Sequence, residues 1–132
     1  MKALDTNILI RFLTGDDDTQ AKKVYALFKQ TESERKELFV PLVVVLEIIW
    51  VLESVYDISR AEIIETVDDL LSMPVLKFEQ PAVLQQLVHF APKNTVDLSD
   101  ILIAGSAKIS GCSAILTFDK KAAKHDRFEL VD

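Results

Sequence analysis

Short apolar runs alternate with helical segments along the whole chain, and this alternation constrains the fold more than any other feature. Ala21, Val24, Tyr25 and Phe28 illustrate the spacing of a half-buried helix between two such runs. Strands that alternate with helices form right-handed β-α-β units in a parallel sheet. We therefore predict an α/β fold in a single domain, residues 1–132, with about five parallel strands and helices on both faces. The runs expected to form strands are residues 1–4, 38–40, 75–78, 113–118 and 128–131.

Composition places the chain among ordinary folded proteins. At 132 residues and 49% hydrophobic content, it is long enough to bury a core without cross-links. Its one cysteine, Cys112, excludes an internal disulfide and suits a reducing compartment. The first residues lack the pattern of a secretion signal, so we expect a cytoplasmic protein. The longest apolar run, residues 38–52, is interrupted by Pro41 and Glu47 and is too short to span a membrane.

Local signals mark where several helices begin and end. Gly15 fits the end of a first helix, and Pro81 fits the first position of a later one. Ser59 and Glu62 have the spacing of a capping box before the stripe at residues 63–71. The long apolar run from residue 42 to 52 favours a deeply packed helix over a strand.

Four acidic residues stand at positions where a parallel sheet gathers functional groups. Asp5 and Asp119 each follow an expected strand, and the carboxyl ends of parallel strands share one edge of the sheet. Asp100 begins a helix that leads back from that edge. Glu47 is the one acid in the apolar helix at residues 42–52, where an unpaired carboxylate is costly to bury. Together they predict one acidic site.

Each acid also has a purely structural interpretation. Asp5 could be simply a turn and cap residue, although we expect Thr6 or Asn7 to supply the cap oxygen of the next helix. Asp97 and Asp100 have the spacing of a capping box, and Glu47 could occupy an exposed position on a mostly buried helix.

The chemistry of the four acids is that of a hard cation site. No cysteine or histidine stands at ligand spacing beside them, and an all-oxygen set suits Mg²⁺ or Mn²⁺. Such an ion activates water and neutralises charge on a phosphodiester. Because clustered carboxylates repel one another, we also expect at least one of them to have a raised pKa without metal.

The net charge of −6 argues against a protein that adheres nonspecifically to nucleic acid. A polyanionic substrate would need local cations, and the candidates follow the first and fourth expected strands. Ordinary solvated side chains are the alternative interpretation. The candidates are Arg11, Lys120, Lys121 and Lys124.

Four segments of the chain resemble the PIN-domain nucleases, and most of all the VapC-type ribonuclease toxins of toxin–antitoxin pairs. They run in the family's order over nearly the whole sequence. The segments are Leu4-Asp-Thr-Asn-Ile-Leu-Ile-Arg11, Val45-Leu-Glu-Ile-Ile-Trp-Val-Leu52, Asp97-Leu-Ser-Asp-Ile-Leu-Ile-Ala104 and Leu116-Thr-Phe-Asp119.

By position, the resemblance matches Asp5, Glu47, Asp100 and Asp119 to the family's four acids. It implies a Mg²⁺-dependent endoribonuclease that acts on RNA, is usually dimeric and is held inactive by a cognate antitoxin. Asp5, Asp100 and Asp119 are the implied metal ligands, and Glu47 a ligand or a group that orients water. The implied supporting residues are Thr6, Asn7, Asp97 and Thr117.

Other functions remain open at this point. A dehalogenase-like phosphatase would need a second acid two residues after Asp5, where Asn7 stands. A response-regulator receiver would need paired acids at the first strand. A PIN-like fold used only for binding is the third alternative. The apolar surface of residues 42–56 and 63–71 predicts association with a second copy or with an antitoxin helix, and Trp50 is a candidate for a core or interface position.

Overall fold

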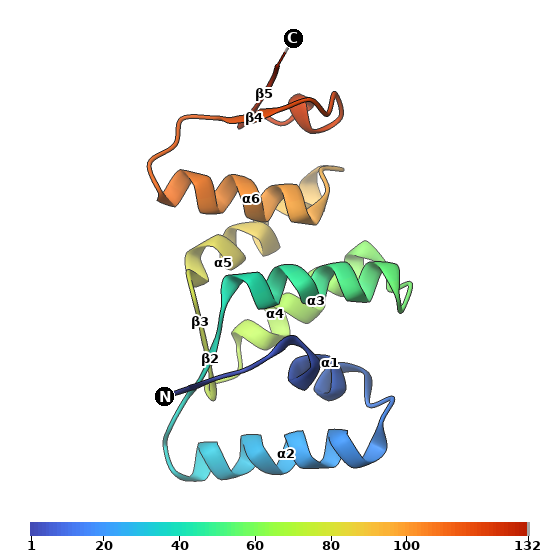
Figure 1. Ribbon diagram of the computed structural model, residues 1–132, viewed down its shortest axis with the longest axis vertical. Helices are drawn as coiled ribbons and strands as arrows, with labels where there is room; N and C mark the ends of the chain where they lie inside the picture. Colours follow the sequence, from blue (N-terminus) through green and yellow to red (C-terminus); the bar gives the residue numbers. More distant parts are fainter. Residues whose placement is uncertain (132) are drawn as a thin grey trace.

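The computed structural model describes residues 1–131 and confirms the α/β alternation. In those residues all five expected strands form, and every strand pair is parallel. Figure 1 shows the elements in chain order. They are β1 (Lys2–Ala3), α1 (Thr6–Thr14), α2 (Asp18–Ser33), β2 (Leu38–Val40), α3 (Leu42–Ser54), α4 (Arg60–Leu71), β3 (Leu76–Phe78), α5 (Pro81–Phe90), η1 (Ala91–Lys93), α6 (Leu98–Ile109), β4 (Ile115–Thr117), η2 (Ala122–Lys124) and β5 (Phe128–Leu130).

Strands β1, β2 and β3 form one sheet in that order, which we call the N-terminal sheet. Its register aligns Lys2 with Leu38 and Leu38 with Leu76, and β1 is extended by a bond from the Leu4 amide to the Phe39 carbonyl. Alternate side chains point to opposite faces of a sheet. One face is therefore buried by Leu38, Val40, Leu76 and Phe78, while Ala3 and Lys77 on the other face are exposed.

Strands β4 and β5 form a separate two-stranded sheet, the C-terminal sheet, so the five strands are not in one sheet. Ile115 and Phe128 are register partners, and they pack with Ala104 of α6 and Ala122 of η2 in a small second cluster. The sequence pattern identifies β4 as a strand, but it carries no information on which strand is its neighbour.

The main core lies between the N-terminal sheet and the helices. It extends from Leu4 to Leu102, and α6 is anchored in it by Leu98, Ile101 and Leu102. The stripe on α4 predicted to associate is instead buried within this chain, at Ile63, Ile64, Val67 and Leu70. Trp50 on α3 is 60% exposed, which excludes the core position and leaves the interface interpretation open.

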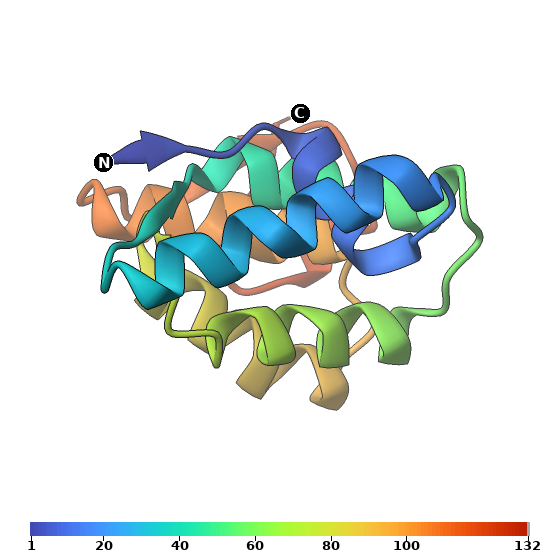
Figure 2. The same ribbon diagram turned by 90° about the horizontal axis from the view of Figure 1, so that it is seen from below.

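The elements are stacked along the long axis of the molecule. Figure 1 places α2 at one end and the C-terminal sheet at the other, with α3, α4, α5 and α6 between them. Figure 2, seen from below, shows α2 in front along that axis and the two chain ends on the same side of the molecule. No helix within residues 1–131 combines the length and apolar character needed to cross a membrane.

Candidate active site

Asp5 lies at the junction of β1 and α1 and is itself the N-cap of the helix. Its backbone is extended, and Oδ1 accepts a hydrogen bond from the Thr6 amide at 2.7 Å. The expectation that Thr6 or Asn7 would supply the cap oxygen was therefore wrong, and the alternative interpretation of Asp5 as a cap residue is confirmed. The helix ends at Gly15 in the left-handed conformation, as predicted.

Thr6 links the first acid to the second. Its side chain is buried, and its hydroxyl donates to Oε2 of Glu47 at 2.9 Å. Glu47 is exposed on α3, in agreement with the interpretation of an open position on a mostly buried helix. Asn7 is exposed in the first turn of α1. This first acidic group, defined as Asp5 and Glu47, is held together by one threonine.

Asp97 and Asp100 occupy the start of α6, but they do not form the capping box that their spacing allowed. Asp97 is at the N-cap position without a side-chain cap bond. Its Oδ1 instead lies 3.5 Å from Nζ of Lys121, with both side chains largely exposed. Asp100 is half-buried in the first turn of the helix. The two carboxylates are thus close enough to affect each other, and they interact with residues of the segment after β4.

Asp119 follows β4 as predicted and is fixed by local bonds. Its amide donates to the hydroxyl of Thr117 at 3.0 Å, and its Oδ1 accepts from the Lys121 amide at 2.9 Å. Thr117 therefore shapes the turn that presents Asp119. We define Asp97, Asp100 and Asp119 as the second acidic group.

The pKa of Asp100 reflects its burial first and the neighbouring acids of the second group next. Partial burial raises the pKa of Asp100, and the negative charges of Asp97 and Asp119 raise it further, while His125 and Lys121 oppose this. The predicted raised pKa among the candidate acids is thereby found at Asp100. A bound cation would remove the repulsion that raises it.

Two residues beside this group were missed from the sequence. Partial desolvation and the charge of Asp97 raise the pKa of Glu53 at the end of α3. Arg60 donates to the carbonyls of Val96, Ala91 and Asn94, and so fixes the loop that leads to Asp97. Glu53 stands six residues after Glu47, and a second acid near the end of an apolar helix was the one signal available for it.

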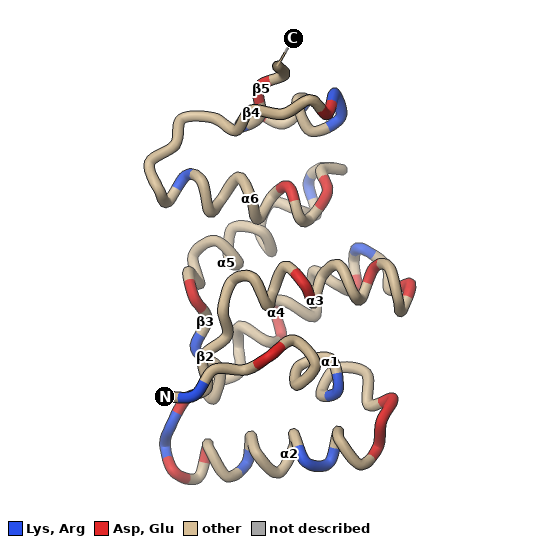
Figure 3. The backbone as a smooth tube through the Cα atoms, in the orientation of Figure 1, with Lys and Arg blue, Asp and Glu red and all other residues tan. Residues whose placement is uncertain are grey.

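The two acidic groups lie in different parts of the molecule. Figure 3 shows acidic segments at the junction of β1 and α1 and, in a separate layer, at the beginning of α6. Within residues 1–131, no three acidic, histidine or cysteine side chains are close enough together to hold a metal ion. The oxygen donors of these acids therefore fit a hard cation. In the described chain, however, the first acidic group is separated from the second.

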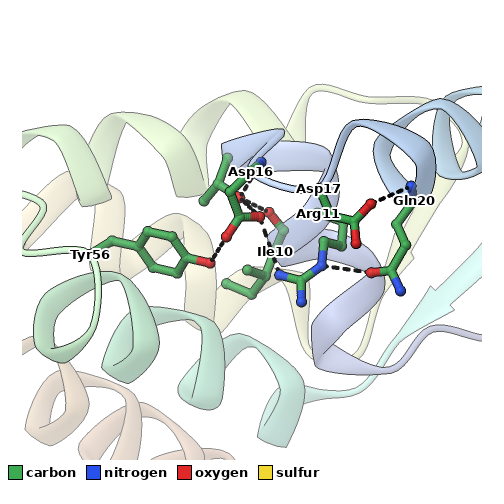
Figure 4. Close-up of polar contacts among 7 residues, drawn as sticks. Ile10, Arg11, Asp16, Asp17, Gln20 and Tyr56 are labelled. Atoms are coloured by element: carbon green, nitrogen blue, oxygen red, sulfur yellow. Dashed lines mark hydrogen bonds and ion pairs between the residues drawn. The ribbon is translucent and has the colours of Figure 1, made fainter.

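Arg11 is directed to the loop between α1 and α2. Its guanidinium bonds to Asp16 at 3.3 Å and to Gln20 at 2.7 Å, and Figure 4 shows Tyr56 reaching the same Asp16. The Tyr56 hydroxyl donates to Asp16 at 2.6 Å, and this bond is the largest of the effects that lower the pKa of Asp16. In this structure Arg11 thus helps to hold α1, the following loop and α2 together.

The three lysines after β4 are exposed but differ in their surroundings. Lys121 pairs with Asp97, as described, and Lys120 extends from the turn. Lys124 lines a cavity of about 420 Å³ between α5, α6 and the segment after η2, together with Lys108 and Arg127. Asp126 lines the same cavity, so its charge is mixed, with basic side chains in excess.

Comparison with known proteins gives consistent results. A family model described as "PIN domain" matches residues 2–128. The chain is also similar to a protein named "VapC ribonuclease" from Aquifex aeolicus (strain VF5). The two are 27% identical over 124 residues, which cover 94% of this chain and 91% of the relative.

Proposed function

Because the chain belongs to the PIN domain family, we propose that it is an endoribonuclease that requires Mg²⁺ or Mn²⁺. Nuclease is the class that both the family match and the similar ribonuclease support. RNA as the substrate, and the role of toxin in a toxin–antitoxin pair, follow in this proposal from that relative. The observation that carries it is the carboxylate set itself, all oxygen donors, with Asp100 repelled by Asp97 and Asp119.

In this proposal Asp5, Asp100 and Asp119 are the residues that would hold the ion, and the described arrangement brings Asp100 and Asp119 together but leaves Asp5 apart from them. When bound, the ion would supply an activated water and neutralise charge on the scissile phosphate. Thr6 fixes one oxygen of Glu47, which leaves that carboxylate oriented to accept a proton from an attacking water. Thr117 and the Lys121 amide hold Asp119 in place. Asp97 and Asn7 are supporting residues next to the proposed ligands.

The proposed partners are the RNA substrate, a cognate antitoxin and a second copy of the chain, in the cytoplasm. Exposed apolar side chains on α3 support an association. Val43 and Trp50 lie one turn on either side of Glu47, and they are 64% and 60% exposed. An antitoxin that covered this face would also cover Glu47, which gives inhibition a direct steric route.

The test is cleavage of single-stranded RNA by the purified chain with added Mg²⁺. We expect Asp5→Asn to keep the cap bond to Thr6 but to reduce cleavage by at least ~100-fold, since the ion loses a charged ligand. Asp69→Asn, an exposed acid on α4, is the matched control and should cleave normally. Cleavage that survives both EDTA and Asp5→Asn would overturn the proposal, whereas RNA binding without cleavage would favour a binding module.

A further inference from the structure

The cavity between α5, α6 and the segment after η2 has an apolar side and a charged side. Val83 and Phe90 of α5 and Ile101 of α6 form apolar surface. The cavity volume of about 420 Å³ lies within the range of about 300–1,000 Å³ that is typical of pockets for small organic molecules. Within residues 1–131, no acid of the two acidic groups lines the cavity, so it is separate from the candidate active site.

The charged side of the cavity has more cations than acids. Lys108 stands in the last turn of α6, and Lys124 and Arg127 belong to the segment after β4. Asp126 is the one carboxylate that lines the cavity in the described part of the chain. The ion pairs found in residues 1–131 include none of these four side chains. With His125 counted as neutral, the cavity therefore has an excess of two positive charges.

Arg127 is fixed at this cavity, yet one of its donors is unused. Its amide donates to Nδ1 of His125 at 3.1 Å, and its Nη2 donates to the carbonyl of Cys112 at 3.2 Å, just beyond the end of α6. Nε is buried and has no hydrogen-bond partner within residues 1–131. Because buried polar groups are almost always paired, this donor indicates an acceptor that the described residues do not supply. Binding to the end of α6 accounts for Nη2 but not for Nε.

The unused donor and the excess charge both favour a phosphate monoester as the ligand. A guanidinium presents parallel N–H groups that match two oxygens of a phosphate. A phosphate monoester carries about −1.5 to −2 charges near neutral pH, which balances the excess of positive charge in the cavity. Inorganic phosphate would leave the apolar side uncovered, so the ligand needs an apolar body as well.

The apolar side of the cavity suits a flat ring with polar edges. Phe90 is 50% exposed, and aromatic side chains of this kind stack on nucleobases. Gln86 lines the same cavity, and its amide can both donate to and accept from the edge of a base. We propose that the cavity binds a nucleoside monophosphate, with the phosphate at Lys108 and Arg127 and the base against Phe90.

The cationic and apolar features stand at different ends of the cavity, as this ligand requires. Ile101 and Lys108 both line it from α6, and seven residues of helix separate them by about 10 Å along the axis. The bond just beyond the end of α6 places Arg127 at the Lys108 end. Phe90 belongs to the opposite end, because Asn94 donates to its carbonyl in the loop that leads into α6.

A ligand in this cavity would join the C-terminal segment to the helices. Arg127 comes from the segment whose own apolar cluster is small, whereas α5 and the start of α6 belong to the main core. Figure 1 shows this segment as the outermost layer, beyond α6. Binding should therefore slow amide hydrogen exchange in residues 122–128 more than in α2. The site is additional to the proposed function and does not depend on cleavage of RNA.

Titration calorimetry with the full chain tests the site. The probes are the 5′-monophosphates of adenosine, guanosine, cytidine and uridine, with EDTA present so that no metal-bound phosphate contributes at the candidate active site. We expect at least one probe to bind at least ~10-fold more tightly than its nucleoside or inorganic phosphate. Absence of binding, or equal binding of phosphate or nucleoside alone, would overturn the proposal. Phenyl phosphate that bound as tightly as the best probe would overturn the assignment of a nucleobase.

Matched variants then locate the binding. Lys108→Gln removes a cation that lines the cavity and is not a candidate for contact with RNA. Lys23→Gln removes the same charge from an exposed position on α2. We expect Lys108→Gln to weaken binding of the best probe by about 10-fold and Lys23→Gln to bind it as wild type does. Equal affinities for the Lys108→Gln and Lys23→Gln chains would overturn the proposal.

Arg127→Gln tests the unused donor, and we expect it to weaken binding by at least ~10-fold. If this variant disturbs the C-terminal segment, Lys108→Gln still decides, because Lys108 is exposed. Amide exchange supplies the second measurement of place. Protection by the probe in α5, α6 and residues 122–128 supports the site, whereas protection confined to other segments would overturn it.

Discussion

Asp100 is the residue at which the charge of the site affects stability most directly. Its pKa is raised, so at neutral pH the folded state holds a carboxylate that unfolding would relieve. This contribution is destabilising above the raised pKa, declines as the pH falls through it, and is gone below the ordinary pKa of an aspartate. We expect Asp100→Asn, in EDTA, to melt higher than wild type near neutral pH and to lose that advantage on acidification.

Thermal melts of Asp69→Asn provide the comparison, because that acid is exposed on α4 and belongs to neither acidic group. Mg²⁺ should also raise the melting temperature of wild type more than that of Asp100→Asn. If Asp100→Asn melts lower than wild type at every pH, its carboxylate is a structural group of α6 and the repulsion is unimportant.

The role of a single residue was predictable from the sequence where it depends only on residues nearby in the chain. The ends of strands marked Asp5 and Asp119 correctly as residues that follow β1 and β4. The spacing of Asp97 and Asp100 suggested a capping box, but the Asp97 carboxylate is paired with Lys121, twenty-four positions along the chain. Such a partner is set by how α6 meets the C-terminal sheet, and no local pattern contains it.

At the scale of elements, the packing of α5 against α6 depends on one glycine. A Cβ added at Gly105 would lie 2.8 Å from Cγ1 of Val83, which is 2% exposed and branched at Cβ. We expect Gly105→Ala to destabilise the fold by about 1–3 kcal/mol, measured by chemical denaturation, because a packed core resists added volume.

Val83→Ala supplies the control for this packing. It removes the methyl that the new Cβ would meet, so the double variant should lose less stability than the two single variants together. Simple additivity would show that α6 shifts to accept the alanine and that Gly105 does not set the distance between the helices.

The bounds of helices and strands were also easier to predict than the elements against which they pack. The helix signals at Gly15, Ser59 and Pro81 all correspond to observed ends, and β2 has its expected bounds. The placement of β4 was not predictable, since its apolar residues fit any parallel neighbour. Its position depends on Ile115, which packs against Ala104 of α6. Nothing in the sequence of either segment indicates that the two are in contact.

For the whole molecule, the proposed function raises the question of how a chain of net charge −6 would approach RNA. We expect replacement of Lys120, Lys121 and Lys124 with glutamine to flatten the salt dependence of RNA binding. For each phosphate that the variant no longer binds, the slope of log K against log salt should fall by about 0.7 for a single strand. Replacing Lys22, Lys23 and Lys29 on α2 removes the same charge at the other end of the molecule. Equal slopes for the two triple variants would remove the C-terminal lysines from the binding surface.

The division of the apolar side chains into two clusters has a consequence for synthesis. The main core is complete at Leu102, whereas Asp119 belongs to the smaller cluster's segment, near the end of the chain. Folding during translation proceeds from the N-terminus. The body of the protein can therefore collapse on the ribosome before the last acid has been made. If the chain has the proposed function, its set of four candidate acids is incomplete until translation has passed Asp119, late in the chain.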